Sequence, residues 1–117
     1  MFVVPSIYVS NKFTSFHIKL PNHNFEDSVS VEISGQKQSK ILVTCLYRSG
    51  SPQKALQKDD EMYRLMRTIP AAPGYTMNVI IGDFNLNKIL WSTDLELPAS
   101  LYEDSVEHKF VEMLETP

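Results

Sequence analysis

A nearly continuous apolar run constrains the fold of this chain more than any other feature of its sequence. Residues 40–47 are Lys-Ile-Leu-Val-Thr-Cys-Leu-Tyr, so apolar side chains occupy both alternating sets of positions. Successive side chains of a strand point to opposite faces of a sheet, and a strand that is apolar on both faces needs a covering layer on each side. The run therefore predicts a central strand of an α/β sheet, buried on both faces.

Apolar segments around this run predict the other strands of the sheet. Residues 28–34 alternate apolar and polar side chains, which indicates a strand with one face toward solvent. Residues 2–10 and 13–20 are rich in apolar and aromatic side chains and flank a short polar turn, so we expect two strands paired as a hairpin. Pro5 cannot donate to a ladder, which places the first of them at an edge. A further apolar run at 77–81 predicts one more strand.

Helical periodicity predicts the segments that cover the sheet. An apolar stripe at helical spacing predicts a helix over about residues 53–68, which Pro70 ends. A Ser-x-x-Glu capping pattern at 100–103 and an apolar stripe over 106–114 predict a second helix. The element order indicates an α/β (α+β mixed) fold, with one mixed sheet and helices on one face. The other face has no covering helices in this sequence, so association with a partner through that uncovered sheet face is an expectation.

Composition and charge fit one globular domain spanning residues 1–117. Hydrophobic residues make up 43% and charged residues 21% of the chain, as in ordinary folded proteins. The net charge of −3 lacks the basic excess of a typical nucleic-acid binder, so whole-chain charge gives no support for DNA binding. We see no signal peptide and no apolar run of roughly the 20 residues that a transmembrane helix needs. We therefore expect no membrane partner. Cys45 is the one cysteine, which favours a reducing compartment, so we expect an intracellular protein.

A short polar motif follows the last predicted strand and carries the chemistry. Gly82-Asp83-Phe84-Asn85 places an acid and an amide two residues apart, where extended geometry would put both on one side. A carboxylate can orient an attacking water or coordinate Mg²⁺, and an amide can donate to a developing oxyanion on phosphorus. The pair suits hydrolysis of phosphate esters. Asp and Asn are also common turn residues after a strand, which is the structural alternative.

The wider context of this motif resembles the endonuclease/exonuclease/phosphatase superfamily. Residues 78–85, followed by Leu86 and, further on, Trp91, are most similar to the endonuclease domains of non-LTR (LINE-type) retrotransposons. Other segments that match that family in order and spacing are Ile7-Tyr8-Val9, residues 25–33, residues 41–48 with Ser51-Pro52, and residues 107–114. The resemblance covers nearly the whole chain and implies a partial α/β sandwich of this superfamily.

The resemblance implies a role for four residues. Asp83 would position the nucleophilic water or ligate a metal, Asn85 would hydrogen-bond the scissile phosphate, and Tyr47 would sit near it as a phenol donor. Arg48 would contact the DNA backbone, since a guanidinium suits phosphate oxygens. The family's cofactor is Mg²⁺ and its partner is DNA. In the structural alternative Tyr47 caps a strand and Arg48 forms a surface ion pair.

Several groups of the family's active site have no match in these 117 residues. The principal metal-binding glutamate and an early asparagine of the family lie before the matched region, and a closing Ser-Asp-His segment lies after it. None of His17, His23 and His108 sits in a matching context. The resemblance therefore implies a partial domain that lacks a complete active site, with no complete metal site, although Asp83 remains a possible ligand.

The sequence thus leads to one main functional hypothesis and two alternatives. The main one is a fragment of a Mg-dependent phosphodiester hydrolase, the DNA endonuclease domain of a non-LTR retrotransposon reverse transcriptase polyprotein. Such a DNA-nicking role would place it in the nucleus. The first alternative is a non-catalytic, domesticated fragment that acts as an interaction module. The second is a phosphatase of the same superfamily.

Overall fold

The computed structural model describes residues 5–49, 55–85, 89–90 and 99–100. The chain divides into two compact units, residues 1–84 and residues 85–117. In the second unit, the described elements are two short antiparallel strands, β5 (Ile89–Leu90) and β6 (Ala99–Ser100). The first unit holds the sheet, the helix and most of the residues that the sequence singles out.

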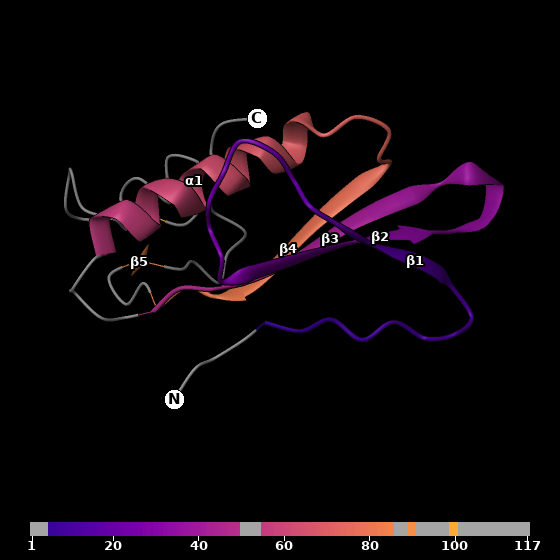
Figure 1. Ribbon diagram of the computed structural model, residues 1–117, viewed down its shortest axis with the longest axis horizontal. Coiled ribbons are helices and arrows are strands. Elements are labelled where there is room, and N and C mark those ends of the chain that lie inside the picture. The colour runs from indigo at the N-terminus through magenta and orange to yellow at the C-terminus, as the bar shows by residue number, and fades with distance from the viewer. Residues whose placement is uncertain (1–4, 50–54, 86–88, 91–98, 101–117) are drawn as a thin grey trace. The chain divides into compact units, whose positions relative to one another are not determined.

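The first unit is built on a four-stranded mixed sheet in the order β1-β2-β3-β4 (Figure 1). The strands are β1 (Thr14–Ile18), β2 (Ser28–Ser34), β3 (Lys40–Tyr47) and β4 (Met77–Asp83). A short 3-10 turn (Gln36–Gln38) joins β2 to β3, and helix α1 (Ala55–Ala71) joins β3 to β4. The first three strands are antiparallel and β4 runs parallel to β3. The prediction of a mixed α+β fold is confirmed, with the apolar run of residues 40–47 as an interior strand.

Helix α1 lies over one face of the sheet and forms the core with it (Figure 1). On β3, the alternating side chains Leu42, Thr44 and Leu46 are 0–1% exposed, and Met62, Leu65 and Ile69 of α1 are equally buried. Full burial of each large apolar side chain contributes about 1.5–3 kcal/mol. The Thr44 hydroxyl shares a hydrogen bond of 2.9 Å with Ser30 on β2, so neither buried hydroxyl lacks a partner.

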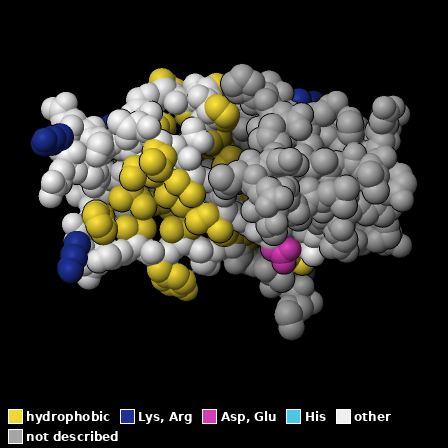
Figure 2. All heavy atoms as spheres, turned by 180° about the vertical axis from the view of Figure 1, so that it is seen from behind, with side chains coloured by type: hydrophobic (Ala, Val, Ile, Leu, Met, Phe, Trp, Pro, Cys, Tyr) yellow, Lys and Arg dark blue, Asp and Glu magenta, His cyan; other side chains and the backbone are white. Residues whose placement is uncertain are grey.

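The opposite face of the sheet is also apolar but less covered. Cross-strand register places Ile33, Ile41 and Met77 in one row of this face, and Val29, Cys45 and Ile81 in another. Met77 and Ile81 are each 56% exposed. Figure 2, which views the molecule from the side opposite to that of Figure 1, shows hydrophobic side chains gathered in a patch on the surface. The expectation that β3 is buried on both faces is therefore wrong for this second face, where its side chains are half-buried.

The predicted N-terminal hairpin is wrong for the described residues. Residues 5–10 form no strand, and β1 pairs instead with β2, Thr14 opposite Ser34. Ile7 and Val9 are half-buried while Tyr8 is 95% exposed, so the segment alternates without belonging to a ladder. Alternation indicates an extended chain with two different sides but does not identify a hydrogen-bonding partner.

The ends of α1 and β4 also differ from the sequence prediction, and β1 (Thr14–Ile18) is shorter than the predicted strand over 13–20. Helix α1 continues through Pro70 to Ala71, and Ala72 closes it with a 3.2 Å bond from its N–H to the Ile69 carbonyl. A proline in the last turn removes only one donor there, which the end of a helix tolerates better than its middle. Strand β4 runs two residues past the predicted 77–81, so Asp83 is its last residue. The predicted helix over 106–114 lies outside the described residues.

Candidate functional site

The carboxyl ends of β3 and β4 bring two sequence-predicted residues together. Because these strands are parallel, their carboxyl ends share one edge of the sheet, which is where α/β proteins place their sites. Tyr47 and Asp83 are register partners in this ladder. The pairing continues one step further, since the Arg48 N–H donates to the Asp83 carbonyl at 2.8 Å. A phenol and a carboxylate from two distant motifs thus lie on neighbouring strands and on the same side of the sheet.

Gly82 allows the two strands to approach closely at this edge. It is opposite Leu46 in the register, and a Cβ built on Gly82 would collide with the Leu46 carbonyl oxygen. A side chain of any size at this position would push β4 away from β3. Gly82 therefore serves the close approach of the two backbones rather than an unusual φ.

A buried ion pair holds this edge of the sheet to the helix. Arg48 binds Asp59 of α1 through two parallel bonds, Nε to Oδ1 at 2.8 Å and Nη2 to Oδ2 at 3.0 Å. The two side chains are only 11% and 9% exposed. The Arg48 Nη1 also donates to the Phe84 carbonyl at 3.3 Å. One guanidinium therefore ties together the end of β3, the start of α1 and the residue after β4.

Arg48 was expected to contact the DNA backbone, with a surface ion pair as the alternative. The structure places its side chain in a bidentate pair that is buried rather than on the surface. A guanidinium presents five donors, and three of them are engaged by Asp59 and Phe84. The pair links the end of β3, where Tyr47 lies, to α1.

Asp83 and Asn85 differ in backbone conformation. Asp83 ends β4 in extended geometry and is exposed. Asn85 is also exposed and has φ 49°, in the left-handed region that asparagine tolerates better than most residues. The extended spacing that would put the two side chains on one side therefore does not continue to Asn85. Asn85 begins the second unit of the chain.

The described residues do not by themselves fit a magnesium site. Among them no group of three His, Cys, Asp or Glu side chains lies close enough to hold a metal ion. Mg²⁺ prefers near-octahedral oxygen ligation, and Asp83 offers one carboxylate toward it. The chemistry that this edge itself provides is a carboxylate that can orient water and a phenol that can donate to a phosphate oxygen.

Two groups with shifted pKa values lie away from this edge. Burial lowers the pKa of His23, whose Nδ1 accepts a hydrogen bond of 3.0 Å from the Phe25 N–H. The charge of Glu61 raises this pKa, and the charge of Lys19 lowers it. Burial raises the pKa of Tyr75, and its hydrogen bond to Glu32 adds to this effect. Neither residue has a role in the predicted site.

Asp59 is not among the residues predicted from the sequence, although the sequence holds a signal for it. Asp59 precedes Met62 by three positions and Met66 by seven, so helical spacing places this acid on the buried stripe of α1. A carboxylate on an apolar stripe needs a cationic partner, and such pairs are strongest when bidentate. The helical spacing therefore predicts that Asp59 has a cationic partner, but it does not identify that partner as Arg48.

Comparison with models of protein families, with curated proteins and with solved structures finds no match to this chain. In the part of the chain that the structure describes, no helix is long and apolar enough to cross a membrane.

Proposed function

We propose that this chain carries part of the active site of a phosphodiester hydrolase of the endonuclease/exonuclease/phosphatase type, acting on DNA as in non-LTR retrotransposons. The observation that carries the proposal is the register of Tyr47 with Asp83 at the carboxyl ends of two parallel strands. This arrangement joins the two motifs on which the sequence resemblance rests. The resemblance further implies the superfamily's α/β sandwich and, for a DNA-nicking enzyme, a nuclear location.

Each residue at the edge has a stated task in the proposal. The Asp83 carboxylate orients the water that attacks phosphorus, and the Tyr47 hydroxyl donates to a phosphate oxygen. For Asn85, which begins the second unit of the chain, a hydrogen bond to the scissile phosphate is what the resemblance implies. Arg48 positions Tyr47 through its pair with Asp59.

Magnesium, the cofactor that the resemblance implies, needs ligands in addition to Asp83. No residue of the 117 matches the family's metal glutamate or its closing histidine. Catalytic groups that act as a unit fail together, so the chain on its own should hydrolyse almost nothing. The proposal is therefore a partial site whose activity depends on groups supplied by other segments.

Nicking of supercoiled plasmid in Mg²⁺ tests this proposal. The 117-residue chain should leave the plasmid supercoiled, whereas a fusion to flanking endonuclease segments that supply the glutamate and the histidine should nick it. In that fusion, Asp83→Ala should lower the rate by about 10²–10⁴-fold, the usual range for a general acid or base. Asp60→Ala, which removes an exposed carboxylate of α1, is the matched control and should leave the rate unchanged. A fusion whose rate ignores Asp83→Ala would contradict the assignment.

A second candidate function is an interaction module that uses the second face of the sheet. The observation in its favour is the exposure of Met77 and Ile81, each 56%, in the apolar rows of that face. Exposed apolar patches of this kind mark sites of protein association. Sedimentation velocity should show self-association that Met77→Lys with Ile81→Lys removes, while Tyr8→Ser, at an exposed residue off the sheet, does not. A monodisperse wild-type monomer would exclude self-association through this face.

A further inference from the structure

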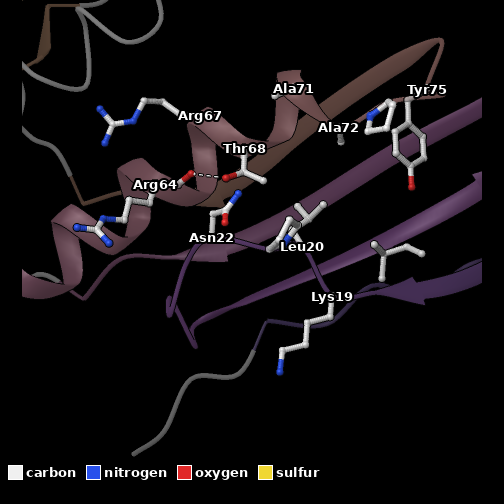
Figure 3. Close-up of a pocket in the computed structure, with 12 residues that line it drawn as sticks. Lys19, Leu20, Asn22, Arg64, Arg67, Thr68, Ala71, Ala72 and Tyr75 are labelled. Atoms are coloured by element: carbon white, nitrogen blue, oxygen red, sulfur yellow. Dashed lines mark hydrogen bonds between the residues drawn. The ribbon is translucent and has the colours of Figure 1, made fainter.

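A groove with a cationic part and an apolar part lies beside the last turns of α1 (Figure 3). It has a volume of about 560 Å³ and is formed by α1, the segment that follows β1 and the segment before β4. Tyr75, one of its lining residues, immediately precedes Thr76, whose N–H bonds the carbonyl of Lys40 at the start of β3. The groove is thus near the amino ends of β3 and β4 and shares no residue with the Tyr47–Asp83 edge.

Among the residues that the structure describes, three cations and no acidic residue line the groove. Arg64 and Arg67 extend from α1, and Lys19 comes from the segment after β1 (Figure 3). Arg64 is 61% exposed and its Nη1 lies 3.7 Å from the Glu61 carboxylate, a loose surface pair of the kind that stabilises little. Lys19 and Arg67 are exposed as well. The described lining of the groove therefore presents a net positive charge to solvent, which the loose pair of Arg64 with Glu61 offsets only in part.

The apolar part of the groove is built from residues already held in place. Leu20 is 6% exposed and packs into the core. Tyr75 is half-buried, and its hydroxyl donates a 2.9 Å hydrogen bond to Glu32, which fixes the ring. Ala71 and Ala72 leave room beside it, because their side chains are single methyl groups. A preformed apolar surface binds a ligand without the cost of ordering its own side chains.

The two parts follow one another along the helix. Arg64 and Arg67 are three residues apart and lie on neighbouring positions of α1, and Ala71 comes one turn later. Figure 3 shows the two guanidinium groups on one side of the view and Ala71, Ala72 and Tyr75 on the other. At 1.5 Å per helical residue, about 10 Å separates Arg64 from Ala71 along the axis. An extended peptide covers that length in about three residues.

We propose that this groove binds an acidic peptide segment of a partner protein, with carboxylates against Arg64 and Arg67 and an apolar side chain on Leu20 and Tyr75. Charge complementarity selects an anionic ligand, and the apolar part selects one that carries apolar side chains. A nucleic-acid backbone matches the cations but offers nothing for the apolar surface. This interaction is separate from phosphodiester hydrolysis and does not depend on it.

Fluorescence anisotropy of the 117-residue chain with labelled peptides tests the proposal. The probe is an extended peptide in which Glu pairs precede Leu by three positions, and its controls replace every Glu by Gln or every Leu by Ser. We expect saturable binding of the Glu–Leu peptide only. Arg64→Gln with Arg67→Gln should weaken it about tenfold, as expected for loss of two charge pairs. Ala71→Glu, at an exposed helical position that accepts glutamate, should abolish it.

The matched control is Lys12→Gln with Lys37→Gln, which removes the same charge at exposed residues outside the groove. This variant should bind the peptide as the wild type does, and Asp83→Ala should also leave binding unchanged. Absence of saturable binding, equal loss in the lysine control, or equal binding of the Gln peptide would overturn the proposal. So would tighter binding of a duplex oligonucleotide that depends on Arg64 and Arg67, since that result assigns the groove to nucleic acid.

Discussion

The two ends of the β3–β4 pair are held in different ways. At the carboxyl end, Arg48 and Asp59 form a buried bidentate pair, and Gly82 lies against the backbone of Leu46. At the amino end, the ion pair is Lys40 with Glu32 at 4.0 Å, and the Lys40 side chain is 49% exposed. The ion pair at the end where Tyr47 and Asp83 lie together is thus more buried than the Lys40–Glu32 pair, and the proposed site would need its geometry held in this way.

Breaking the buried ion pair of Arg48 with Asp59 should lower the free energy of unfolding more than any other change considered below. Asp59→Ala leaves the Arg48 guanidinium buried without its carboxylate, which should lower the free energy of unfolding by about 3–5 kcal/mol. Urea denaturation followed by circular dichroism measures this loss. At the other end of the strands, Glu32→Gln should cost less than about 1 kcal/mol, because the pair with Lys40 is partly exposed. Equal losses would show that the two ends are held alike.

The two glycines provide a second comparison of the ends. Gly82→Ala should lower the free energy of unfolding by about 3 kcal/mol, since a Cβ there meets the Leu46 carbonyl and must force β4 away from β3. Gly74→Ala, in the turn before β4, should cost about 1–2 kcal/mol, because φ +88° is strained for alanine but the space around it is open. Thermal melts of both variants measure the difference, and a smaller loss at Gly82 than at Gly74 would contradict the close approach.

The two tyrosines at the ends should separate stability from function. Tyr75→Phe removes the 2.9 Å hydrogen bond to Glu32 and should cost about 0.5–1.5 kcal/mol without changing plasmid nicking by the fusion. Tyr47→Phe should leave stability nearly unchanged and lower the nicking rate, because its hydroxyl is assigned to the phosphate. The opposite result, with stability lost in Tyr47→Phe and activity lost in Tyr75→Phe, would indicate that the site lies at the amino ends of β3 and β4.

The smallest expected effect on stability is its pH dependence, which depends on His23. Burial lowers the pKa of His23 in the folded chain, so the unfolded chain binds the proton more readily, near the ordinary histidine pKa of about 6.5. Stability should therefore be complete above that value and decrease as pH falls from about 7 toward 5. Protonation of Nδ1 also removes the acceptor for the Phe25 N–H. Denaturant midpoints across this range should show a shallower slope for His23→Gln, and an unchanged slope would contradict the assignment.

Periodicity predicted most of the first unit because its elements are strongly patterned. The alternation of residues 28–34 and the apolar run of 40–47 match β2 and β3 in both bounds. The apolar stripe of α1 is also correct, but its end is not, because a proline is tolerated in a last turn. The partner of β1 could not be predicted from alternation alone, which describes faces and not neighbours.

The candidate site shows the same division between local pattern and tertiary contact. Motifs identified Tyr47 and Asp83, and the parallel βαβ connection brings them into register. The bidentate pair of Arg48 with Asp59 depends on how α1 crosses the sheet, which no local pattern specifies. The left-handed backbone of Asn85 likewise overrides the extended spacing that the motif suggests.

Chemical-shift mapping tests whether the carboxyl ends of β3 and β4 form a site for a phosphodiester. The measurement titrates a short single-stranded DNA oligonucleotide into the isotopically labelled chain and follows the backbone amides. We expect the largest shifts at Tyr47, Arg48 and Asp83, and weaker binding of the oligonucleotide to Tyr47→Phe. Largest shifts around Arg64 and Arg67, or no shifts at the strand ends at millimolar DNA, would contradict the assignment.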